Sequence, residues 1–268
     1  MNTPSRWTYP GVALSLFLAS FSLDAIVVAA DPAASPAEEN PAMPGFQKDA
    51  SDARAMEIAD EVMRAMGGRP AWDNTHYVRW LFFGRRMHYW NKWTGDVRIE
   101  AGDKLVLMNI QTRKGRVWEK GVEVTQPESL QTRLEKGFAW WTNDSYWVFM
   151  PYKLKDSGVR LRYLGERAMQ DGKPADVLEL TFTGVGLTPE NKYDIFVDKQ
   201  TRLVSEWSYY EKAGDGEPKF TMPWKAWRKV GDIMLAGDHG RSEPDWKLAA
   251  FSTLPASVFT SPDSVKVQ

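Results

Sequence analysis

Short segments in which apolar and polar residues alternate fill most of the chain from Tyr77 onward, and each ends at a turn signal. Residues 97–100, Val-Arg-Ile-Glu, are one example. This period of two is typical of antiparallel strands that have one face in the core and the other in solvent. Glycine-containing turns join the first five segments into a meander of hairpins. The expected strands are residues 77–83, 86–91, 96–101, 105–110 and 116–120.

A second series of such segments follows Pro151. The expected strands are residues 159–165, 175–182, 192–198, 203–211, 220–230 and 233–236. Together the two series give about ten to eleven strands, with no alternation of strand and helix. That order excludes parallel α/β folds, including nucleotide-binding Rossmann-type domains. We therefore predict a mainly β fold with some helix (α+β), built from antiparallel strands.

An amphipathic helix is expected before the first strand, from about Asp52 to Met66. Its apolar residues recur at the spacing of one helical face, and Gly67-Gly68 provides a stop. The residues of this face are Ala55, Ile58, Ala59, Val62 and Met66.

A second helical segment lies between the two series of strands. Thr125 and Glu128 form a capping box at its start. A cap at Thr142 or Asn143 would begin a further turn or two, which Pro151 ends. Six aromatic residues between positions 138 and 149 make this the densest aromatic cluster of the chain. Because Gly137 and Pro151 bracket the segment, we expect it to move as a lid.

The first 30 residues have the pattern of a secretory signal peptide. Arg6 supplies the positive end, an apolar run follows, and small residues end at Ala30, near which we expect cleavage. An uncleaved anchor is the alternative, because residues 11–30 reach the roughly 20 residues that cross a bilayer. Asp24 within the run favours cleavage. Residues 31–50 are rich in proline and alanine and predict a disordered linker, which leaves residues 51–268 as a single domain.

Composition excludes several classes of function. The 34 Lys+Arg and 35 Asp+Glu leave a net charge of -1, so no nucleic-acid partner is expected. The absence of cysteine excludes thiol nucleophiles, cysteine-based zinc sites and iron–sulfur centres. The sequence has no zinc-protease, phosphate-loop or dinucleotide-binding motif. We therefore assign no catalytic residue, no metal ligand and no cofactor.

His239 lies in the most enzyme-like stretch, Gly-Asp-His-Gly-Arg-Ser-Glu at residues 237–243. It combines a carboxylate, an imidazole and a hydroxyl, which are the groups of a hydrolase. A polar turn is the other interpretation, because catalytic triads are assembled from separate loops. A pair of carboxylates of the glycosidase type also stays open, since pairing needs coordinates.

The aromatic content is high, with 13 Trp, 9 Tyr and 12 Phe. If the strands form one curved sheet, its apolar face needs a cover, and two helical pieces cover about ten strands poorly. An apolar cavity is therefore expected; the alternative is a fully packed core. The predicted ligand-binding residues are Trp80, Phe82, Met87, Tyr89, Val97, Ile99, Leu107, Leu178, Leu180, Ile195 and Trp207.

One segment, Trp-Thr-Asn-Asp-Ser-Tyr-Trp at residues 141–147 followed by Phe-Met-Pro-Tyr-Lys-Leu at 149–154 and Asp-Ser-Gly-Val at 156–159, is distinctive. Together with the leader, the helix ending Ala-Met-Gly-Gly and the strand meander, it resembles the periplasmic LolA/LolB-like superfamily, especially members described as outer-membrane lipoprotein-sorting proteins. The resemblance implies an incomplete antiparallel β-barrel with helices over its concave apolar face. It also implies binding of lipoprotein acyl chains or other lipids. The arginine that latches the lid in those carriers is not assigned among Arg79, Arg85, Arg86 and Arg98.

The predicted function is that of a non-enzymatic periplasmic carrier for an apolar ligand such as a lipid or an acyl chain, with a membrane or a lipoprotein as a further partner. A secreted hydrolase that uses carboxylates or His239 is the first alternative. The second is an envelope protein that binds another protein or acts as a sensor through its sheet edge or aromatic cluster.

Overall fold

The structure, a computed structural model, describes residues 39–240 and 246–266, which belong to one compact unit, Glu38–Gln268. The expected signal peptide and the first part of the expected linker lie outside the described residues. Within them, the fold is mainly β with helices, and every strand pair is antiparallel, as predicted.

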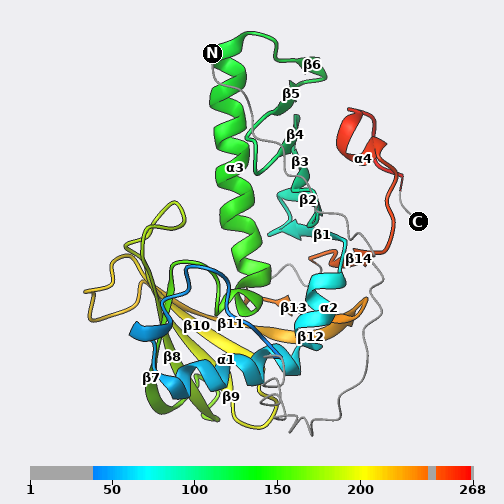
Figure 1. Cartoon of the computed structure of the whole chain (residues 1–268). Coiled ribbons are helices and arrows are strands. Elements are labelled where there is room, and N and C mark those ends of the chain that lie inside the picture. Colours follow the sequence, from blue (N-terminus) through cyan, green and yellow to red (C-terminus); the bar gives the residue numbers. More distant parts are fainter. Residues whose placement is uncertain (1–38, 241–245, 267–268) are drawn as a thin grey trace, which may run out of the picture. The chain divides into compact units, whose positions relative to one another are not determined.

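Seven strands form the first sheet (Figure 1). Consecutive strands are neighbours because short turns, most of which contain glycine, join them as hairpins, and the strand from the end of the chain adds to the edge. In sheet order they are β14 (Ala249–Phe251), β1 (Tyr77–Phe82), β2 (Arg86–Asn91), β3 (Asp96–Ala101), β4 (Lys104–Asn109), β5 (Gly115–Glu119) and β6 (Val122–Glu123).

The remaining strands form a five-stranded and a two-stranded sheet. The five-stranded sheet has the order β11 (Phe220–Pro223), β10 (Val204–Tyr210), β9 (Lys192–Asp198), β8 (Pro174–Phe182) and β7 (Val159–Ala168). The third sheet pairs β12 (Lys225–Val230) with β13 (Ile233–Asp238). Hydrogen bonding thus divides the strands into three sheets, and the expected incomplete barrel is not confirmed.

The strand expected over residues 220–230 is divided at Trp224. Pro223, which has no amide hydrogen to donate, ends β11. The amide of Trp224 then donates to the carbonyl of Ser205 at 2.7 Å before β12 begins. A proline inside an otherwise regular strand pattern therefore marks the change of sheet.

Two helices precede the first sheet. In α1 (Ala53–Ala65) the predicted apolar face is buried, and Met66 beyond its end is also buried. The left-handed Gly67, at φ 107°, ends α1, but the chain turns directly into a short helix that was not predicted, α2 (Gly68–Asn74).

Residues 39–50, expected as part of a disordered linker, follow the edge of β7 instead. The amide of Gln47 donates to the carbonyl of Val159 at 2.9 Å, and Phe46 is buried in the core. A short 3₁₀ turn, η1 (Lys48–Ala50), leads into α1. The proline-rich composition gave no sign that this segment would satisfy the exposed hydrogen-bonding groups of a sheet edge.

The long helix α3 (Pro127–Phe149) is continuous, without the second start expected near Asn143. Its cap also differs from the predicted one, because the side chain of Gln126 accepts the hydrogen bond from the amide of Ser129 at 2.6 Å. A 3₁₀ turn, η2 (Met150–Lys153), follows. The last helix is α4 (Ser257–Thr260). Among the residues that the structure describes, no helix is long and apolar enough to cross a membrane.

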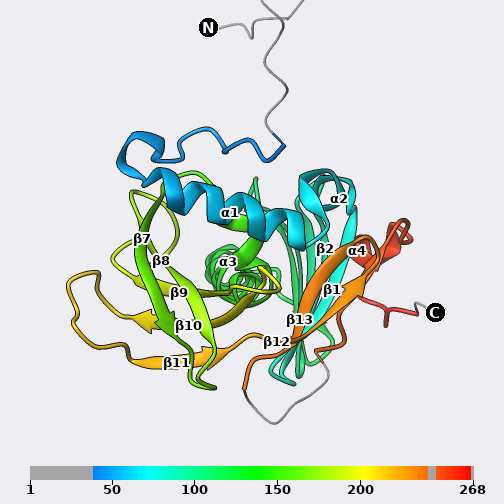
Figure 2. The same cartoon turned by 90° about the horizontal axis from the view of Figure 1, so that it is seen from below.

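Two different sheets pack against α3, which Figure 2 shows end-on between β7–β10 and β1–β2. Leu134 in its first half is buried with Val97 and Val106 of the seven-stranded sheet. Trp147 near its end packs edge-on against Trp207 of the five-stranded sheet, with ring centroids 4.8 Å apart. One helix therefore packs against both sheets, and its two halves have different neighbours.

Gly137 allows α3 to approach β4 closely. A Cβ atom on this glycine would lie 2.9 Å from Cγ1 of Val106, which is nearer than side chains normally pack. The position is therefore a contact in the middle of a continuous helix. It does not mark the start of a separate lid, so that part of the lid prediction is wrong.

We expect Gly137→Ala to destabilise the protein, although alanine normally stabilises a helix interior by about 0.5–1 kcal/mol relative to glycine. Overpacking against the stiff side chain of Val106 should cost about 1–3 kcal/mol. Urea unfolding measures the change, with Thr132→Ala on the exposed side of α3 as the control. The cost should shrink in a Val106→Ala background. A Gly137→Ala protein more stable than the parent would contradict this close packing.

Candidate functional site

The registers of the seven-stranded sheet separate the predicted ligand-binding residues into two sets. Trp80 pairs with His88, and His88 pairs with Ile99, so these side chains share the face towards α3. Met87, Tyr89 and Leu107 lie on the opposite face, so the expectation that all predicted residues of these strands share one apolar face is wrong for these three. That face is covered by the end of the chain, where buried Arg98 donates to the carbonyls of Ser261 and Asp263 at 2.8 Å.

Most of the predicted ligand-binding residues lie in the packed interior. Trp207 also lines the large cavity described next, and none of the others does. Met87 is half-buried. The remaining nine are buried, namely Trp80, Phe82, Tyr89, Val97, Ile99, Leu107, Leu178, Leu180 and Ile195.

A cavity of about 700 Å³ lies between α3 and the five-stranded sheet. From α3 it is lined by Phe138, Trp141, Thr142, Asn143, Ser145, Tyr146 and Trp147. From the strands it is lined by Val159, Phe182, Tyr193, Trp207, Tyr209 and Phe220. Its volume is in the range of pockets that enclose a small organic ligand.

Aromatic rings form both main walls of this cavity. On the sheet side, Tyr193 and Trp207 stack with their centroids 4.9 Å apart. On the helix side, Tyr146 lies 5.5 Å from Tyr193, and Trp147 meets Trp207 edge-on at 4.8 Å. Each ring is held by its neighbours, so the walls are ordered before any ligand arrives.

Few charged groups line the cavity. Lys153 and Asp156 lie in the turn after α3 and form an ion pair with each other. Burial raises the pKa of Tyr146 well above its usual value, and repulsion from the ionised forms of Tyr193 and Asp156 adds to the shift. Burial likewise raises the pKa of Tyr193 to about 12. The tyrosines are therefore neutral hydrogen-bonding groups at physiological pH.

One side of the cavity is formed by the loop between β8 and β9. Gly184 and Gly186 adopt left-handed conformations at φ 65° and 79°. Leu187 of this loop and Phe220 at the start of β11 are 54% and 36% exposed, although both line the cavity. Apolar side chains thus reach solvent at this side of the cavity.

A buried ionic cluster fixes α3 beside the cavity. The carboxylate of Asp144 accepts hydrogen bonds from Arg86 Nε at 2.6 Å and Arg86 Nη2 at 2.8 Å. Nε2 of His88 lies 2.7 Å from Oδ2 of Asp144. Burial alone would raise the pKa of Asp144, but the hydrogen bonds from Arg86 and His88 outweigh it and lower that pKa. Burial lowers the pKa of His88.

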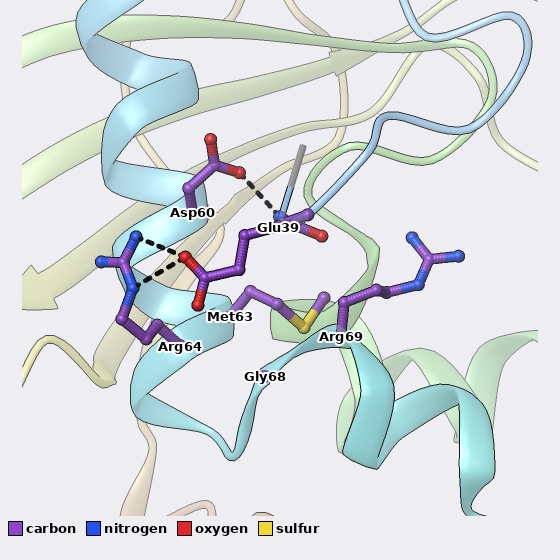
Figure 3. A pocket seen from close by; sticks show the side chains of 7 residues that line it. Glu39, Asp60, Met63, Arg64, Gly68 and Arg69 are labelled. Carbon is purple, nitrogen blue, oxygen red and sulfur yellow. Dashed lines mark hydrogen bonds and ion pairs between the residues drawn. The ribbon is translucent and has the colours of Figure 1, made fainter. Parts of the chain in front are cut away.

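A second, much smaller cavity of about 60 Å³ lies between the N-terminal segment and α1 (Figure 3). Arg64 Nη2 is 3.2 Å from Oε2 of Glu39, and Asn40 donates to Asp60 at 2.7 Å. Lys155 Nζ also donates to Asp60, at 2.9 Å. These pairs tie residues 39 and 40 to α1, and the volume is too small for a drug-sized ligand.

His239 does not form an active site with its sequence neighbours in the described part of the chain. Its side chain is 1% exposed and packs against Trp224 and Trp246, with centroids 4.6 and 4.5 Å away. Burial lowers its pKa to about 3, so it is a weak base at neutral pH. This environment disfavours the hydrolase alternative that would use His239. Within residues 39–240 and 246–266, no group of three or more potential metal ligands occurs.

Sequence reasoning missed most of the cavity lining. The helical part of it lies in the aromatic cluster of residues 138–149, whose density was a visible signal. On the strands, Phe182, Tyr193 and Tyr209 lie two residues from predicted positions and therefore on the same face of the sheet. The composition of the strands indicated which face of the sheet is apolar. It did not indicate where along that face the packed core ends and the cavity begins.

No family model and no curated protein matches the chain. Among solved structures it is similar to a DUF1329 family protein from Desulfovibrio piger, with 16% identity, a TM-score of 0.40, and coverage of 76% of this chain and 96% of that one. It is also similar to a putative outer membrane lipoprotein-sorting protein domain from Vibrio parahaemolyticus, with 10% identity, a TM-score of 0.32, and coverage of 69% and 83%.

A LolA superfamily protein from Nitrosomonas europaea is a further neighbour, with 10% identity, a TM-score of 0.32, and coverage of 71% of this chain and 87% of that one. These similar structures thus include a member of the superfamily that the sequence resembles.

We expect Arg86→Leu to lower the free energy of unfolding by about 3–5 kcal/mol, because it leaves the charge of Asp144 buried without its main partner. Arg85→Leu, at the exposed neighbouring position, should change it by less than about 0.5 kcal/mol. The double variant Arg86→Leu/Asp144→Leu should recover much of the loss. Equal effects of Arg85→Leu and Arg86→Leu in urea unfolding would refute the role of this cluster.

The stability of the protein should fall as the pH drops below about 6.5. His88 and His239 have lowered pKa values in the folded state, so the unfolded chain binds more protons in this range. Replacing His239 by Phe should reduce the slope of unfolding free energy against pH by up to about 1.4 kcal/mol per pH unit. Trp224→Phe, which alters the same packing without removing a titrating group, should leave the slope unchanged.

Proposed function

We propose that this chain is a periplasmic carrier that holds an apolar molecule of the lipid class in the cavity between α3 and the five-stranded sheet. The observation that supports this most is the cavity itself, about 700 Å³ in volume with aromatic walls. Removal of apolar surface from water supplies about 25 cal/mol for each Å² buried. The ordered walls reduce the entropy that binding would cost.

The periplasmic location and the cleaved leader are part of this proposal and follow from the first 30 residues. Of the ligand-binding residues predicted from the sequence, Trp207 is the one that we place in contact with the ligand. The other buried members of that set pack in the interior, where Tyr89 and Leu107 lie under the end of the chain and the rest lie on the inner faces of the two sheets. Exchange of the ligand with a membrane or a lipoprotein would take place beside the loop between β8 and β9, where Leu187 is exposed.

We expect Phe182→Asp to abolish binding of a neutral fluorescent probe, phenylnaphthylamine, because it places a charge in the apolar wall. Thr181→Asp is the matched control, since the adjacent residue of β8 points to the other face and pairs with Lys192. Probe fluorescence is measured at equal protein concentration, with circular dichroism to verify folding. Binding by a folded Phe182→Asp protein would count against the cavity.

The natural ligand is sought by native mass spectrometry and organic extraction of the protein purified from its own envelope. A bound small apolar molecule in stoichiometric amount supports the carrier. A stoichiometric protein partner without any extractable lipid would instead favour the protein-binding alternative.

A further inference from the structure

We propose that the ligand of this cavity is a neutral molecule with a rigid ring system, such as a fused-ring alcohol or ketone, and not a fatty acid. The inference rests on the proposed function and narrows its ligand class. Three features of the cavity carry it: the kind of apolar side chain in its walls, the fixed arrangement of those side chains, and the pairing of its charges.

Aromatic side chains outnumber aliphatic ones in the lining by nine to three. The aliphatic residues are Val159, Val185 and Leu187, and the last two lie in the loop between β8 and β9. The main walls therefore present ring faces and ring edges. Such surfaces gain additional attraction from offset-stacked or edge-on contacts with another ring, beyond the burial of area that any apolar chain would provide.

The rings are also locked in place. Tyr193 lies almost parallel to Trp207, at 12°, and Trp147 lies within 24° of the plane of Phe220, with centroids 5.9 Å apart. A flexible acyl chain would have to give up its rotamer freedom to follow walls of this kind. A rigid ring system has little conformational freedom to lose, so it gains more from the same contact area.

The charges beside the cavity are already paired. Lys153, a lining residue, forms an ion pair with Asp156. Lys219, next to Phe220 in the sequence, lies 2.9 Å from Glu211. A carboxylate or phosphate group would have to displace one of these partners. A hydroxyl or carbonyl finds neutral groups at Ser157 and at Thr188, whose Oγ1 accepts from Asn191 Nδ2 at 2.7 Å and keeps its own hydroxyl hydrogen to donate. The lining therefore favours a ligand without charge.

The test compares three probes on the full chain: dehydroergosterol, a fluorescent fused-ring alcohol; stearyl alcohol, a flexible neutral chain; and stearic acid, the same chain with a charge. Energy transfer from tryptophan measures the binding of dehydroergosterol. The affinities of the other two probes are measured by their competition with dehydroergosterol. We expect dehydroergosterol to bind at least about tenfold more tightly than stearyl alcohol, and stearic acid to bind most weakly.

Ring-to-aliphatic variants separate stacking from burial. Tyr193→Leu and Tyr209→Leu should each weaken the binding of dehydroergosterol about 2- to 12-fold, because each removes one aromatic contact. The affinity for stearyl alcohol should change by less than about 2-fold. Tyr193→Phe, which keeps the ring, should bind like the parent. Trp93→Leu, at a 59% exposed position that does not line the cavity, is the control for tryptophan loss.

Tighter binding of stearic acid than of dehydroergosterol would overturn the inference, and so would equal losses for all probes in the tyrosine-to-leucine variants. In either case, binding of phenylnaphthylamine would leave the carrier function standing. If the parent protein binds neither phenylnaphthylamine nor any of the three probes, the carrier function fails as well.

Discussion

The negative charge of Asp144 is buried in the interior, and the placement of α3 depends on how that charge is neutralised. Arg86 and His88 come from one strand and meet the carboxylate from the sheet side, so the helix is fixed in position along the sheet and in rotation about its own axis. The stacking of Trp80 on His88, at 4.5 Å and 2°, extends the arrangement into the core. Charged groups with fixed geometry give this contact a specificity that apolar packing alone would not have.

The rotation of α3 in turn creates the cavity wall. A helix advances about 100° per residue, so Tyr146 projects about 200° away from Asp144, towards the five-stranded sheet. The same helix therefore presents a charged anchor to one sheet and aromatic rings to the other. Gly137 permits the close approach of its first half to β4, while its second half meets the rings of Tyr193 and Trp207 at a distance set by bulky side chains.

Local sequence patterns located the elements well and their partners less well. The helix of residues 53–65 and the strands from Tyr77 to Glu119 follow from periodicity and turn residues. The face of each strand was harder to predict, since residues 105–108 are apolar at every position. A histidine on the core face was also unexpected, because its partner Asp144 is 56 residues away in the sequence. Long-range pairing of polar groups leaves no period in the local pattern.

The sequence by itself determined the antiparallel β class, the amphipathic first helix and the aromatic richness of the segment before Pro151, because each depends on neighbours within a few residues. Only the tertiary structure decided that the strands divide into three sheets, that residues 39–50 cover an edge, and that the cavity lies beside β7–β11 and not over β1–β4. Those outcomes depend on register and on contacts between distant segments. A one-residue change of register exchanges the two faces of a strand, and composition does not record it.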